Sequence, residues 1–318
     1  MTIRFDERAV IVTGAGAGLG RAYALDLARR GAQVVVNDLG TSVYGDGSSG
    51  GAADDTVREI VEAGGQAVAS YDSVATDQGC RNMTDLALES FGRIDAVVHN
   101  AGIVRNVTFD DMADDQWFPV LETHLLGGFF LSRAVWATMR SQGYGRIVLT
   151  SSSSGAFGRT HGANYASAKA GLLGLCNALA LEGEEHGIFA NAILPNARTR
   201  MSDSPDREHA HLPDGQRPVD LIPRFEVEWV VPMVSYLASE ACERTHEYFS
   251  TAGGRYARVF VGAAVGWRPE EETPPGAEEI AAHIDEITAL DEFDVPATGG
   301  HEIKAVIARH GLSDPGFF

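Results

Sequence analysis

The stretch Thr13-Gly14-Ala15-Gly16-Ala17-Gly18-Leu19-Gly20 decides the fold of this chain because of what stands on either side of it. The apolar run 9–12 precedes it and has the composition of a buried strand, and a helical pattern from Leu19 to Arg30 follows it. Glycines at a strand-to-helix turn let the backbone approach a pyrophosphate, which then lies at the helix N-terminus where free N–H groups favour anions. A glycine-rich turn alone is weak support, but here both flanks fit, so we expect a dinucleotide-binding turn.

Bulk composition narrows the class of protein. The chain has 318 residues, 44% of them hydrophobic, which suits one large α/β domain or two smaller ones. Its 44 acidic and 25 basic side chains give a formal charge of -19, which disfavours nucleic acids and anionic membranes as partners. The N-terminus has no apolar signal core, and no segment approaches the ~20 apolar residues of a membrane span. We therefore expect a soluble cytoplasmic protein.

The cysteines and histidines predict no metal site. Cys80, Cys176 and Cys242 lie far apart and show neither C-x-x-C nor metal-finger spacing, so free thiols in a reducing compartment are expected. His161 lies close in sequence to candidate site residues but has no evident ligand partners.

Strand-like and helical patterns alternate over the first two-thirds of the chain. Strands are predicted at 9–13, 33–37, 67–70, 96–99, 146–151 and 189–194, and helices at 18–30, 53–63, 77–91, 114–140 and 163–186. The strands are continuous apolar runs, as expected when both faces of a sheet are covered. This order predicts an α/β fold, a Rossmann-type doubly wound parallel sheet with helices on both faces and a C-terminal extension.

Loops and a tail complete the organisation. The Gly40–Gly51 loop is expected to be a flexible surface excursion, and the 196–217 loop is placed to be a substrate lid. A main domain is predicted over residues 1–262, with a C-terminal helical extension over 263–318 packed on it. Beyond the lid we expect a helix at 226–239, strands at 248–250 and 258–261, and helices at 277–290 and 301–310.

Asp38 ends the second predicted strand, 18 residues after Gly20. An acidic side chain there accepts hydrogen bonds from the adenosine ribose and repels a 2′-phosphate, which selects NAD over NADP. The alternative is a solvated aspartate that starts a turn. The glycine turn upstream favours the binding role.

Tyr165 and Lys169 stand four residues apart in Tyr-Ala-Ser-Ala-Lys, on one face of a predicted helix. Such a pair is commonplace, but here the serines 151–154 precede it at the carboxyl end of a strand, where doubly wound folds place their sites. A serine there can hydrogen-bond a substrate oxygen, and Tyr165 can move that oxygen's proton. A cationic lysine about 4 Å away supplies about 4 kcal/mol at an effective dielectric near 20, enough to lower a tyrosine pKa by about three units.

Together, the glycine turn, Asn100-Ala101-Gly102, the serines, Tyr-x-x-x-Lys and Pro195 resemble the short-chain dehydrogenase/reductase family. The segments 13–24, 34–40, 71–74, 144–147 and 196–201 are similar to the (3R)-hydroxyacyl-CoA dehydrogenase units of peroxisomal multifunctional enzymes type 2, also described as 17β-hydroxysteroid dehydrogenases of the fourth type. The likeness covers nearly the whole chain and is weakest over 203–215 and after Ala252.

The resemblance implies roles at particular positions. Ser152 would orient the substrate, Tyr165 would act as general acid and base, and Lys169 would assist it. The implied NAD-binding residues are Gly14, Gly16, Gly18, Leu19, Gly20, Asp38, Asp72, Ser73, Asn100, Ala101, Gly102, Tyr165, Lys169, Pro195 and Asn196. Where the family usually has a catalytic asparagine this chain has His124, which is either a proton-relay or water-holding residue or a packed helix histidine. His99, in place of another asparagine, is expected to be structural.

The resemblance also implies the substrate. We expect oxidation of a (3R)-3-hydroxyacyl-CoA to the 3-ketoacyl-CoA, with Arg105, Arg159, Arg198 and Arg200 as candidates for binding coenzyme A phosphates. The alternatives are a hydroxysteroid or steroidal acyl-CoA dehydrogenase and, from another class, a non-catalytic dinucleotide-binding regulatory protein. Intact Ser152, Tyr165 and Lys169 argue against the last. The family commonly forms homodimers or homotetramers through the predicted helices 114–140 and 163–186.

Overall fold

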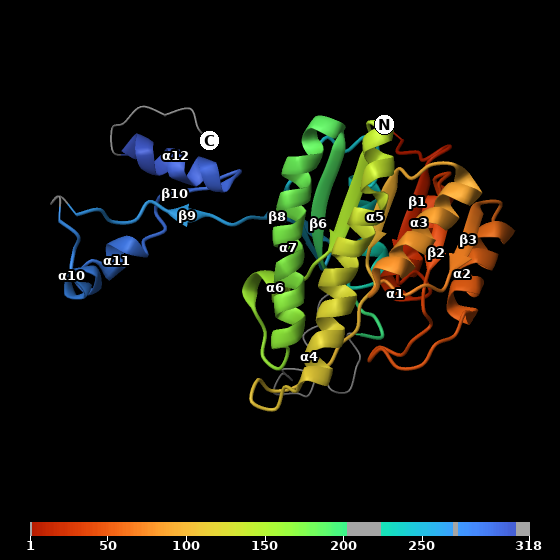
Figure 1. Cartoon of the computed structure of the whole chain (residues 1–318), viewed down its shortest axis with the longest axis horizontal. Helices are drawn as coiled ribbons and strands as arrows, with labels where there is room; N and C mark the ends of the chain where they lie inside the picture. The colour runs from red at the N-terminus through yellow and green to blue at the C-terminus, as the bar shows by residue number, and fades with distance from the viewer. Residues whose placement is uncertain (1, 202–223, 270–272, 310–318) are drawn as a thin grey trace. The chain divides into compact units, whose positions relative to one another are not determined.

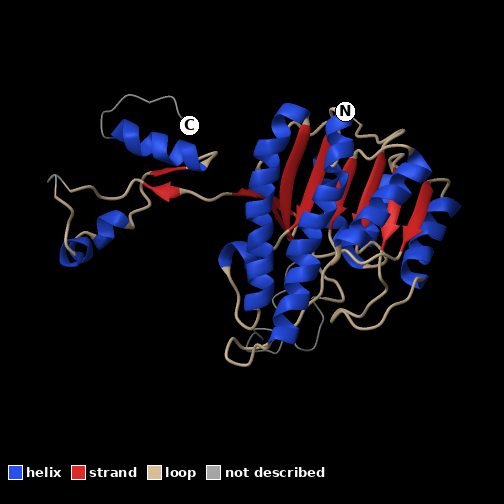
Figure 2. Cartoon of the chain, in the orientation of Figure 1, coloured by secondary structure: helices blue, strands red, loops and turns tan. Residues whose placement is uncertain are grey.

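This computed structural model describes residues 2–201, 224–269 and 273–309, and the account below concerns those residues. Their main sheet has the strand order β3-β2-β1-β4-β5-β6-β7-β8 (Figures 1 and 2). Neighbouring strands from β3 to β7 pair in parallel. The bounds are β1 (Ala9–Thr13), β2 (Gln33–Asn37), β3 (Gln66–Ser70), β4 (Ala96–His99), β5 (Gly145–Thr150), β6 (Ile188–Asn196), β7 (Glu247–Ala252) and β8 (Arg255–Val259). The strand order reverses between β1 and β4, which confirms the doubly wound α/β fold.

Helices cover both faces of this sheet. They are α1 (Gly18–Arg29), α2 (Gly51–Glu62), α3 (Asp77–Phe91), α4 (Asp114–Leu121), α5 (Gly127–Gln142), α6 (Ser153–Phe157), α7 (Ala163–Gly183) and α9 (Val231–Leu237). The helices α3, α5 and α7 lie in front of the sheet in Figure 1. Side chains of α1 and α9, such as Leu27 and Val234, pack with Val10, Val12 and Val34 of the strands in one buried cluster. All five residues of β1 are buried, as a strand covered on both faces requires.

The long helix predicted over 114–140 is interrupted by one wide turn. Between α4 and α5, residues Glu122–Leu126 form a single π-helical turn, η1. Such turns widen the helix by one residue and often lie at functional sites. The period of the apolar residues does not reveal this turn, because the chain stays helical on both sides of it.

The sheet ends in a tight hairpin between β7 and β8. Gly253 and Gly254 connect these strands with φ angles of +58° and +77°. A two-residue turn with positive φ at both positions matches the twist of paired strands, and glycine adopts it without strain.

Contacts divide the chain into Met1–Arg258 and Val259–Phe318. The second unit contains β9 (Ala263–Ala264), β10 (Phe293–Asp294), α10 (Ala277–Ala282), α11 (Ile284–Ile287) and α12 (Gly299–Arg309). Within it, Phe260 stacks on Phe293 and Trp267 on His283, and none of its described residues is buried. The single helix predicted over 277–290 is two short helices. The predicted boundary after residue 262 and the packing of the extension on the main domain stay predictions.

Within the described parts of the chain, no helix is long and apolar enough to cross a lipid bilayer.

Candidate active site

The glycine turn joins β1 to α1 and leaves the start of that helix open to a ligand. Gly14 and Gly18 have φ angles of +63° and +54°, a region that other residues rarely adopt. A Cβ added to Gly20 would lie 2.1 Å from the carbonyl oxygen of Gly14, so a side chain there would push the helix away from the turn. Because the N-cap residue is Ala17, which has no side-chain oxygen, the first N–H groups of α1 stay available to an anion.

Asp38 follows β2, and its carboxylate is hydrogen-bonded to the glycine turn. Its Oδ2 accepts a hydrogen bond from the Gly16 N–H at 2.8 Å, and its Oδ1 accepts one from the Gly40 N–H at 2.7 Å. The carboxylate lines the same pocket as Gly14 and Gly18. An acidic residue at this place in a dinucleotide-binding fold meets the adenosine ribose.

The segment after β4 is fixed to the end of β1. The Thr13 hydroxyl oxygen accepts hydrogen bonds from the N–H groups of Asn100 and Ala101, both at 3.0 Å. The Asn100 side chain donates to the carbonyl oxygens of Thr13 and Gly14 at 3.2 and 3.3 Å. These bonds hold two carboxyl-terminal strand ends together and shape the floor of the pocket between them.

Asp72 is likewise held by its neighbours. Its carboxylate accepts hydrogen bonds from Ser70 Oγ at 3.1 Å and Asn82 Nδ2 at 2.7 Å, and its carbonyl oxygen accepts one from Asn37 Nδ2 at 2.9 Å. Asp72 and Ser73 both line the pocket. Because they follow β3, they lie at the same carboxyl-terminal edge of the sheet as Asp38.

The first half of the Gly40–Gly51 loop is hydrogen-bonded across the pocket, and the flexibility expected for this loop stays a prediction. We call residues 41–46 the strap, and most of them line the pocket. The strap accepts hydrogen bonds at two of its carbonyl groups, from the Val104 N–H at 2.9 Å and from the Arg105 guanidinium at 3.0 Å. It therefore bridges the loop after β2 and the segment after β4.

The Asn164 side chain links the segment after β4, which holds the strap, to α7, the helix that carries Tyr165 and Lys169. Its side chain is fully buried, and its Nδ2 donates to the carbonyl oxygens of Arg105 at 3.0 Å and Gln116 at 2.7 Å. Its Oδ1 accepts a hydrogen bond from the Tyr165 N–H at 2.7 Å. One amide thus connects three segments at the point where Tyr165 begins to project into the pocket.

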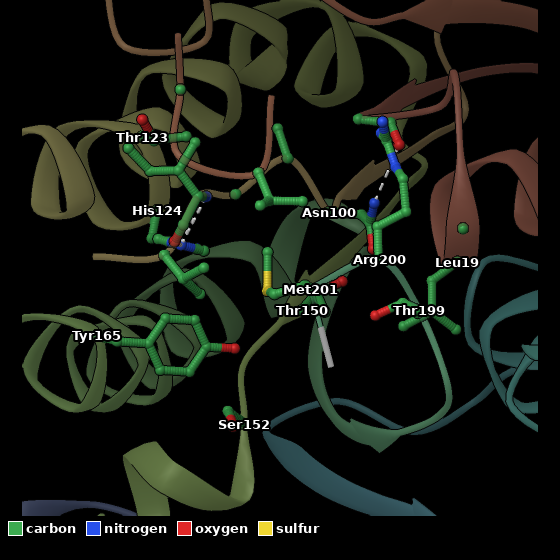
Figure 3. Close-up of a pocket in the computed structure, with 18 of the residues that line it drawn as sticks. Leu19, Asn100, Thr123, His124, Thr150, Ser152, Tyr165, Thr199, Arg200 and Met201 are labelled. Carbon is green, nitrogen blue, oxygen red and sulfur yellow. Dashed lines mark hydrogen bonds between the residues drawn. The ribbon is translucent and has the colours of Figure 1, made fainter. Parts of the chain in front are cut away.

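Ser152, Tyr165 and Lys169 line one pocket, as the sequence predicts. Ser152 is the N-cap of α6, and its Oγ accepts a hydrogen bond from the Ser154 N–H at 3.1 Å. Tyr165 and Lys169 lie on one face of α7, with the lysine Nζ 5.6 Å from the centre of the tyrosine ring. Figure 3 shows the Tyr165 hydroxyl and the Ser152 side chain facing the same space. A substrate oxygen placed there can contact both.

Lys169 is almost completely buried, and burial lowers the pKa of its ammonium group to about 7. Its Nζ donates to the carbonyl oxygen of Thr150. The predicted Coulombic help to Tyr165 therefore depends on pH, because the lysine carries its full charge only below about pH 7.

His124 lies in the π-helical turn, with its ring nearly perpendicular to that of Tyr165 and the ring centres 5.1 Å apart (Figure 3). Its Nε2 lies 2.8 Å from the carbonyl oxygen of Ile103 and 3.2 Å from the Ile103 N–H, so it bonds one or the other according to its tautomer. Its Nδ1 is buried and has no hydrogen-bond partner among the described residues. A free nitrogen beside Tyr165 suits the predicted water-holding role, which stays a prediction.

His99 connects His124 to the glycine turn. Its Nε2 donates to the His124 carbonyl oxygen at 2.9 Å, and its Nδ1 lies 3.3 Å from the Thr13 hydroxyl. Burial, and then the Lys169 charge, lower the pKa of both histidines, that of His99 to about 4. Both rings are neutral near pH 7, so neither adds charge to the site.

The pocket has a volume of about 470 Å³. The predicted residues that line it are Gly14, Gly18, Leu19, Asp38, Asp72, Ser73, Asn100, Ala101, Gly102, His124, Ser152, Tyr165, Lys169, Pro195 and Asn196. Gly16 and Gly20 belong to the glycine turn but are not among the lining residues. Arg105, Arg159 and Arg200 line the pocket, whereas Arg198 is not among the lining residues. The predicted lid spans 196–217, and its residues from 202 to 217 lie outside the described residues.

Sequence reasoning missed several lining residues, among them the strap, Thr150 and Thr123. The strap contacts the rest of the pocket through backbone groups, which leave no side-chain pattern. Thr150 precedes the serines that were singled out, so its position at the end of β5 was a usable signal.

These residues fit a dinucleotide. The open start of α1, the glycine at which a Cβ would meet the turn and the carboxylate at the end of β2 match the pyrophosphate and ribose of such a cofactor. In the described part of the chain, no group of three or more histidine, cysteine or acidic side chains is placed to hold a metal ion.

Comparisons with known proteins identify the family of this chain. Residues 8–209 match the short chain dehydrogenase family model. The chain is 45% identical over 277 residues to the peroxisomal multifunctional enzyme type 2 of Mus musculus, which covers 86% of this chain and 36% of that protein. It is 36% identical over 292 residues to a hydroxyacyl-CoA dehydrogenase of Mycobacterium tuberculosis, covering 86% of this chain and 88% of that one.

A solved structure of a short chain dehydrogenase from Mycobacterium avium superposes with a TM-score of 0.76 at 36% identity, covering 90% of this chain and 97% of that one. The family model, the Mycobacterium tuberculosis relative and the solved structure are all named dehydrogenases. Dehydrogenases of this family are oxidoreductases that act on CH–OH groups, and they typically use NAD or NADP. The chain belongs to the short-chain dehydrogenase/reductase family.

Proposed function

We propose that this protein oxidises a (3R)-3-hydroxyacyl-CoA to the 3-ketoacyl-CoA with NAD as hydride acceptor. The observation that carries the proposal is the convergence of Ser152, Tyr165 and Lys169 on the pocket that begins at the glycine turn and Asp38. The substrate class is supported by the relative named hydroxyacyl-CoA dehydrogenase. The R configuration follows the resemblance to the dehydrogenase units of multifunctional enzymes type 2.

In this mechanism Ser152 and Tyr165 hold the substrate hydroxyl. The Ser152 Oγ donates a hydrogen bond to the substrate oxygen, and the Tyr165 oxygen, as phenolate, takes the hydroxyl proton. A bound nicotinamide supplies the carbon that accepts the hydride. The Tyr165 proton then leaves toward solvent, and we propose that His124 Nδ1, the buried nitrogen beside this ring, holds a water on that route.

Lys169 binds the nicotinamide ribose in this proposal and favours the phenolate when protonated. Its pKa of about 7 means that ligand hydroxyls, which hydrogen-bond the ammonium form, would raise its charged fraction on binding. The protonated fraction of Lys169, and hence the positive charge beside Tyr165, is therefore largest when the ligands are bound.

We further propose that the enzyme works in the cytoplasm as a homodimer or homotetramer. Apolar side chains on α4, η1, α5 and α7 support such an interface, since Phe118, Leu126, Phe129 and Leu181 are exposed in the single chain.

The test follows NADH or NADPH formation by the purified protein. The substrates are (3R)- and (3S)-hydroxyacyl-CoAs, a steroidal acyl-CoA and free hydroxysteroids, each with NAD or NADP. Turnover confined to NAD and R thioesters is expected. Activity with free hydroxysteroids alone, or only with NADP, would contradict the proposal, and so would absence of turnover with every thioester while NAD still binds.

A further inference from the structure

His99 is the last residue of β4, and its ring is buried against the start of α5. A Cβ added to Gly127 would lie 3.1 Å from the His99 Cε1, and one added to Gly128 would lie 3.2 Å from its Cδ2. The first two residues of α5 are thus small enough to leave room for an imidazole, which fills that room. A larger side chain at either position would displace the ring.

The two ring nitrogens of His99 bond to two different segments. Its Nε2 lies 2.9 Å from the His124 carbonyl oxygen, which can only accept, so Nε2 carries the proton. Burial, and then the Lys169 charge, lower the pKa of the His99 ring to about 4, so the neutral ring has only this one N–H near pH 7. Its Nδ1 is therefore an acceptor, and the Thr13 hydroxyl, 3.3 Å away, donates to it.

This order of donors and acceptors orients the Thr13 hydroxyl. With its hydrogen directed at His99, its oxygen accepts from the N–H groups of Asn100 and Ala101, each at 3.0 Å. Both of these residues line the pocket in which the cofactor is expected. One nitrogen of His99 thus acts, through Thr13, on the segment that receives the cofactor.

The other nitrogen holds the π-helical turn that carries His124. The His124 ring packs closely on the segment after β4, because a Cβ added to Gly102 would lie 2.1 Å from its Cε1. On its other side the ring is 5.1 Å from the Tyr165 ring, centre to centre (Figure 3). A shift of the His124 backbone would therefore change how its ring lies beside Tyr165.

We propose that His99 is a positioning residue for the reaction, holding the cofactor-binding segment with one ring nitrogen and the His124 turn with the other. The inference rests on the proposed function, in which His124 holds a water beside Tyr165. It goes beyond the structural role expected for His99. Since His99 is not among the residues that line the pocket, it acts through Thr13 and His124.

Two substitutions each keep one of the two bonds. The amide oxygen of asparagine is as many bonds from Cα as the histidine Nδ1, so His99→Asn keeps an acceptor for Thr13 and loses the bond to His124. The amide nitrogen of glutamine is as many bonds from Cα as Nε2, so His99→Gln keeps a donor for His124 and loses the acceptor for Thr13. The control is Ser132→Ala, which removes a buried hydroxyl on α5 that has no hydrogen-bond partner among the described residues.

The NAD dissociation constant is measured by calorimetry, and kcat with (3R)-3-hydroxybutyryl-CoA at saturating NAD. For His99→Asn we expect kcat to fall about 3- to 10-fold, the range for one lost hydrogen bond, with NAD binding nearly unchanged. For His99→Gln we expect the reverse, an NAD dissociation constant raised about 3- to 10-fold and a kcat near that of the wild type. Ser132→Ala should change neither quantity. Any other pattern, such as equal losses in both quantities or none, would mean that His99 only packs the core, and would overturn the inference.

A double variant tests whether the effect on kcat passes through the His124 ring. In a His124→Ala background, His99→Asn should lower kcat no further, because the ring that it positions is gone. A further loss as large as in the wild type would place the effect of His99 elsewhere and contradict the inference.

The ring spectrum of the histidines separates this inference from the proposed function, because it needs no substrate. In a 1H–15N spectrum at pH 7, the His99 signals, assigned by their absence from the His99→Gln protein, should be those of the Nε2–H tautomer. If the wild type oxidises the thioester but His99 is the Nδ1–H tautomer, only the role of His99 is wrong. If the tautomer is as expected but no thioester is oxidised, the proposed function fails and the inference falls with it.

Discussion

The two ends of the pocket are built differently. At the adenosine end, Asp38, Asp72 and Asn100 each make two or more hydrogen bonds to neighbouring protein groups. At the catalytic end, the buried His124 Nδ1 and Thr150 Oγ1 have no partner among the described residues, and the pKa of Lys169 is lowered to about 7. The three side chains at the adenosine end already have protein partners, whereas the catalytic end holds buried side-chain groups that a ligand would satisfy.

This difference separates the two tasks of the site. Groups that already have their partners need no rearrangement to receive the adenosine half, so binding there loses little to ordering. Groups buried without partners cost stability in the free protein and regain it when cofactor and substrate supply hydrogen bonds. Substitutions at the adenosine end should therefore weaken NAD binding, whereas substitutions at the catalytic end should lower the rate or raise the free energy of unfolding.

The largest effect is expected for Tyr165→Phe, which removes the hydroxyl that moves the proton. Loss of a general acid–base group lowers the rate by about 10²- to 10⁴-fold. NAD affinity should stay within a few-fold, since the adenosine end is untouched. Steady-state kinetics and a calorimetric NAD titration on the same preparation check this. Activity near that of the wild type would remove Tyr165 from the mechanism.

Lys169→Met should raise the free energy of unfolding, most strongly at low pH. The folded-state pKa of Lys169 is about 7, below its unfolded value of 10.5, so the unfolded chain binds the proton more tightly between these limits. The wild type therefore carries the full penalty below pH 7 and loses it as the pH rises toward 10.5. The advantage of the variant should shrink by up to about 1.4 kcal/mol per pH unit across this window.

Urea denaturation of both proteins at pH 6, 7, 8 and 9 measures that advantage. A difference that does not vary with pH would mean that the buried lysine is not the titrating group, and the contrast between the two ends would lose its main support.

Asp38→Asn affects the adenosine end alone. It removes the charge that repels a 2′-phosphate, and one of the two oxygens that accept from Gly16 and Gly40 becomes an NH2 donor. NAD affinity should fall about 10- to 100-fold, as for a lost bond to a charged group, while the preference for NAD over NADP shrinks. Asp55→Asn, at an exposed position on α2, is the matched control. An unchanged cofactor preference would contradict the role given to Asp38.

The smallest effect is expected for Arg105→Gln, which loosens the strap. The guanidinium donates to a carbonyl of the strap and lies 3.6 Å from the Asp46 carboxylate, and the loss of both contacts should speed NAD release about two- to tenfold. Stopped-flow displacement of NADH gives this rate. If release is unchanged, the strap does not retain the cofactor.

The sequence could predict those parts of the fold that depend on the pattern of apolar side chains. The first four parallel strands, from Ala9–Thr13 to Ala96–His99, contain apolar runs, and their ends match the structure within a residue. The π-helical turn at His124 leaves the helical period on both sides intact, so the period does not report it. In the tail, the helix predicted over 277–290 breaks at His283, whose ring stacks on Trp267, a contact between residues distant in sequence.

The site shows the same division. Ser152, Tyr165, Lys169 and Asp38 were predicted because each stands at a fixed offset from a strand end or helix start. The strap was not, since it accepts these hydrogen bonds at main-chain carbonyls, which every residue has. Lys169 was placed correctly, but its low pKa follows from burial that no local pattern reveals.

Asn164 sets a limit on how this sequence can vary. Its amide donates to two backbone carbonyls and accepts from one backbone N–H, all buried or partly buried. Aspartate would face two carbonyls with acceptors only, and leucine would leave all three groups unpaired, at about 1–3 kcal/mol each. Because the partners are main chain, no second substitution can compensate. A substitution at position 164 should therefore cost stability at several main-chain groups at once.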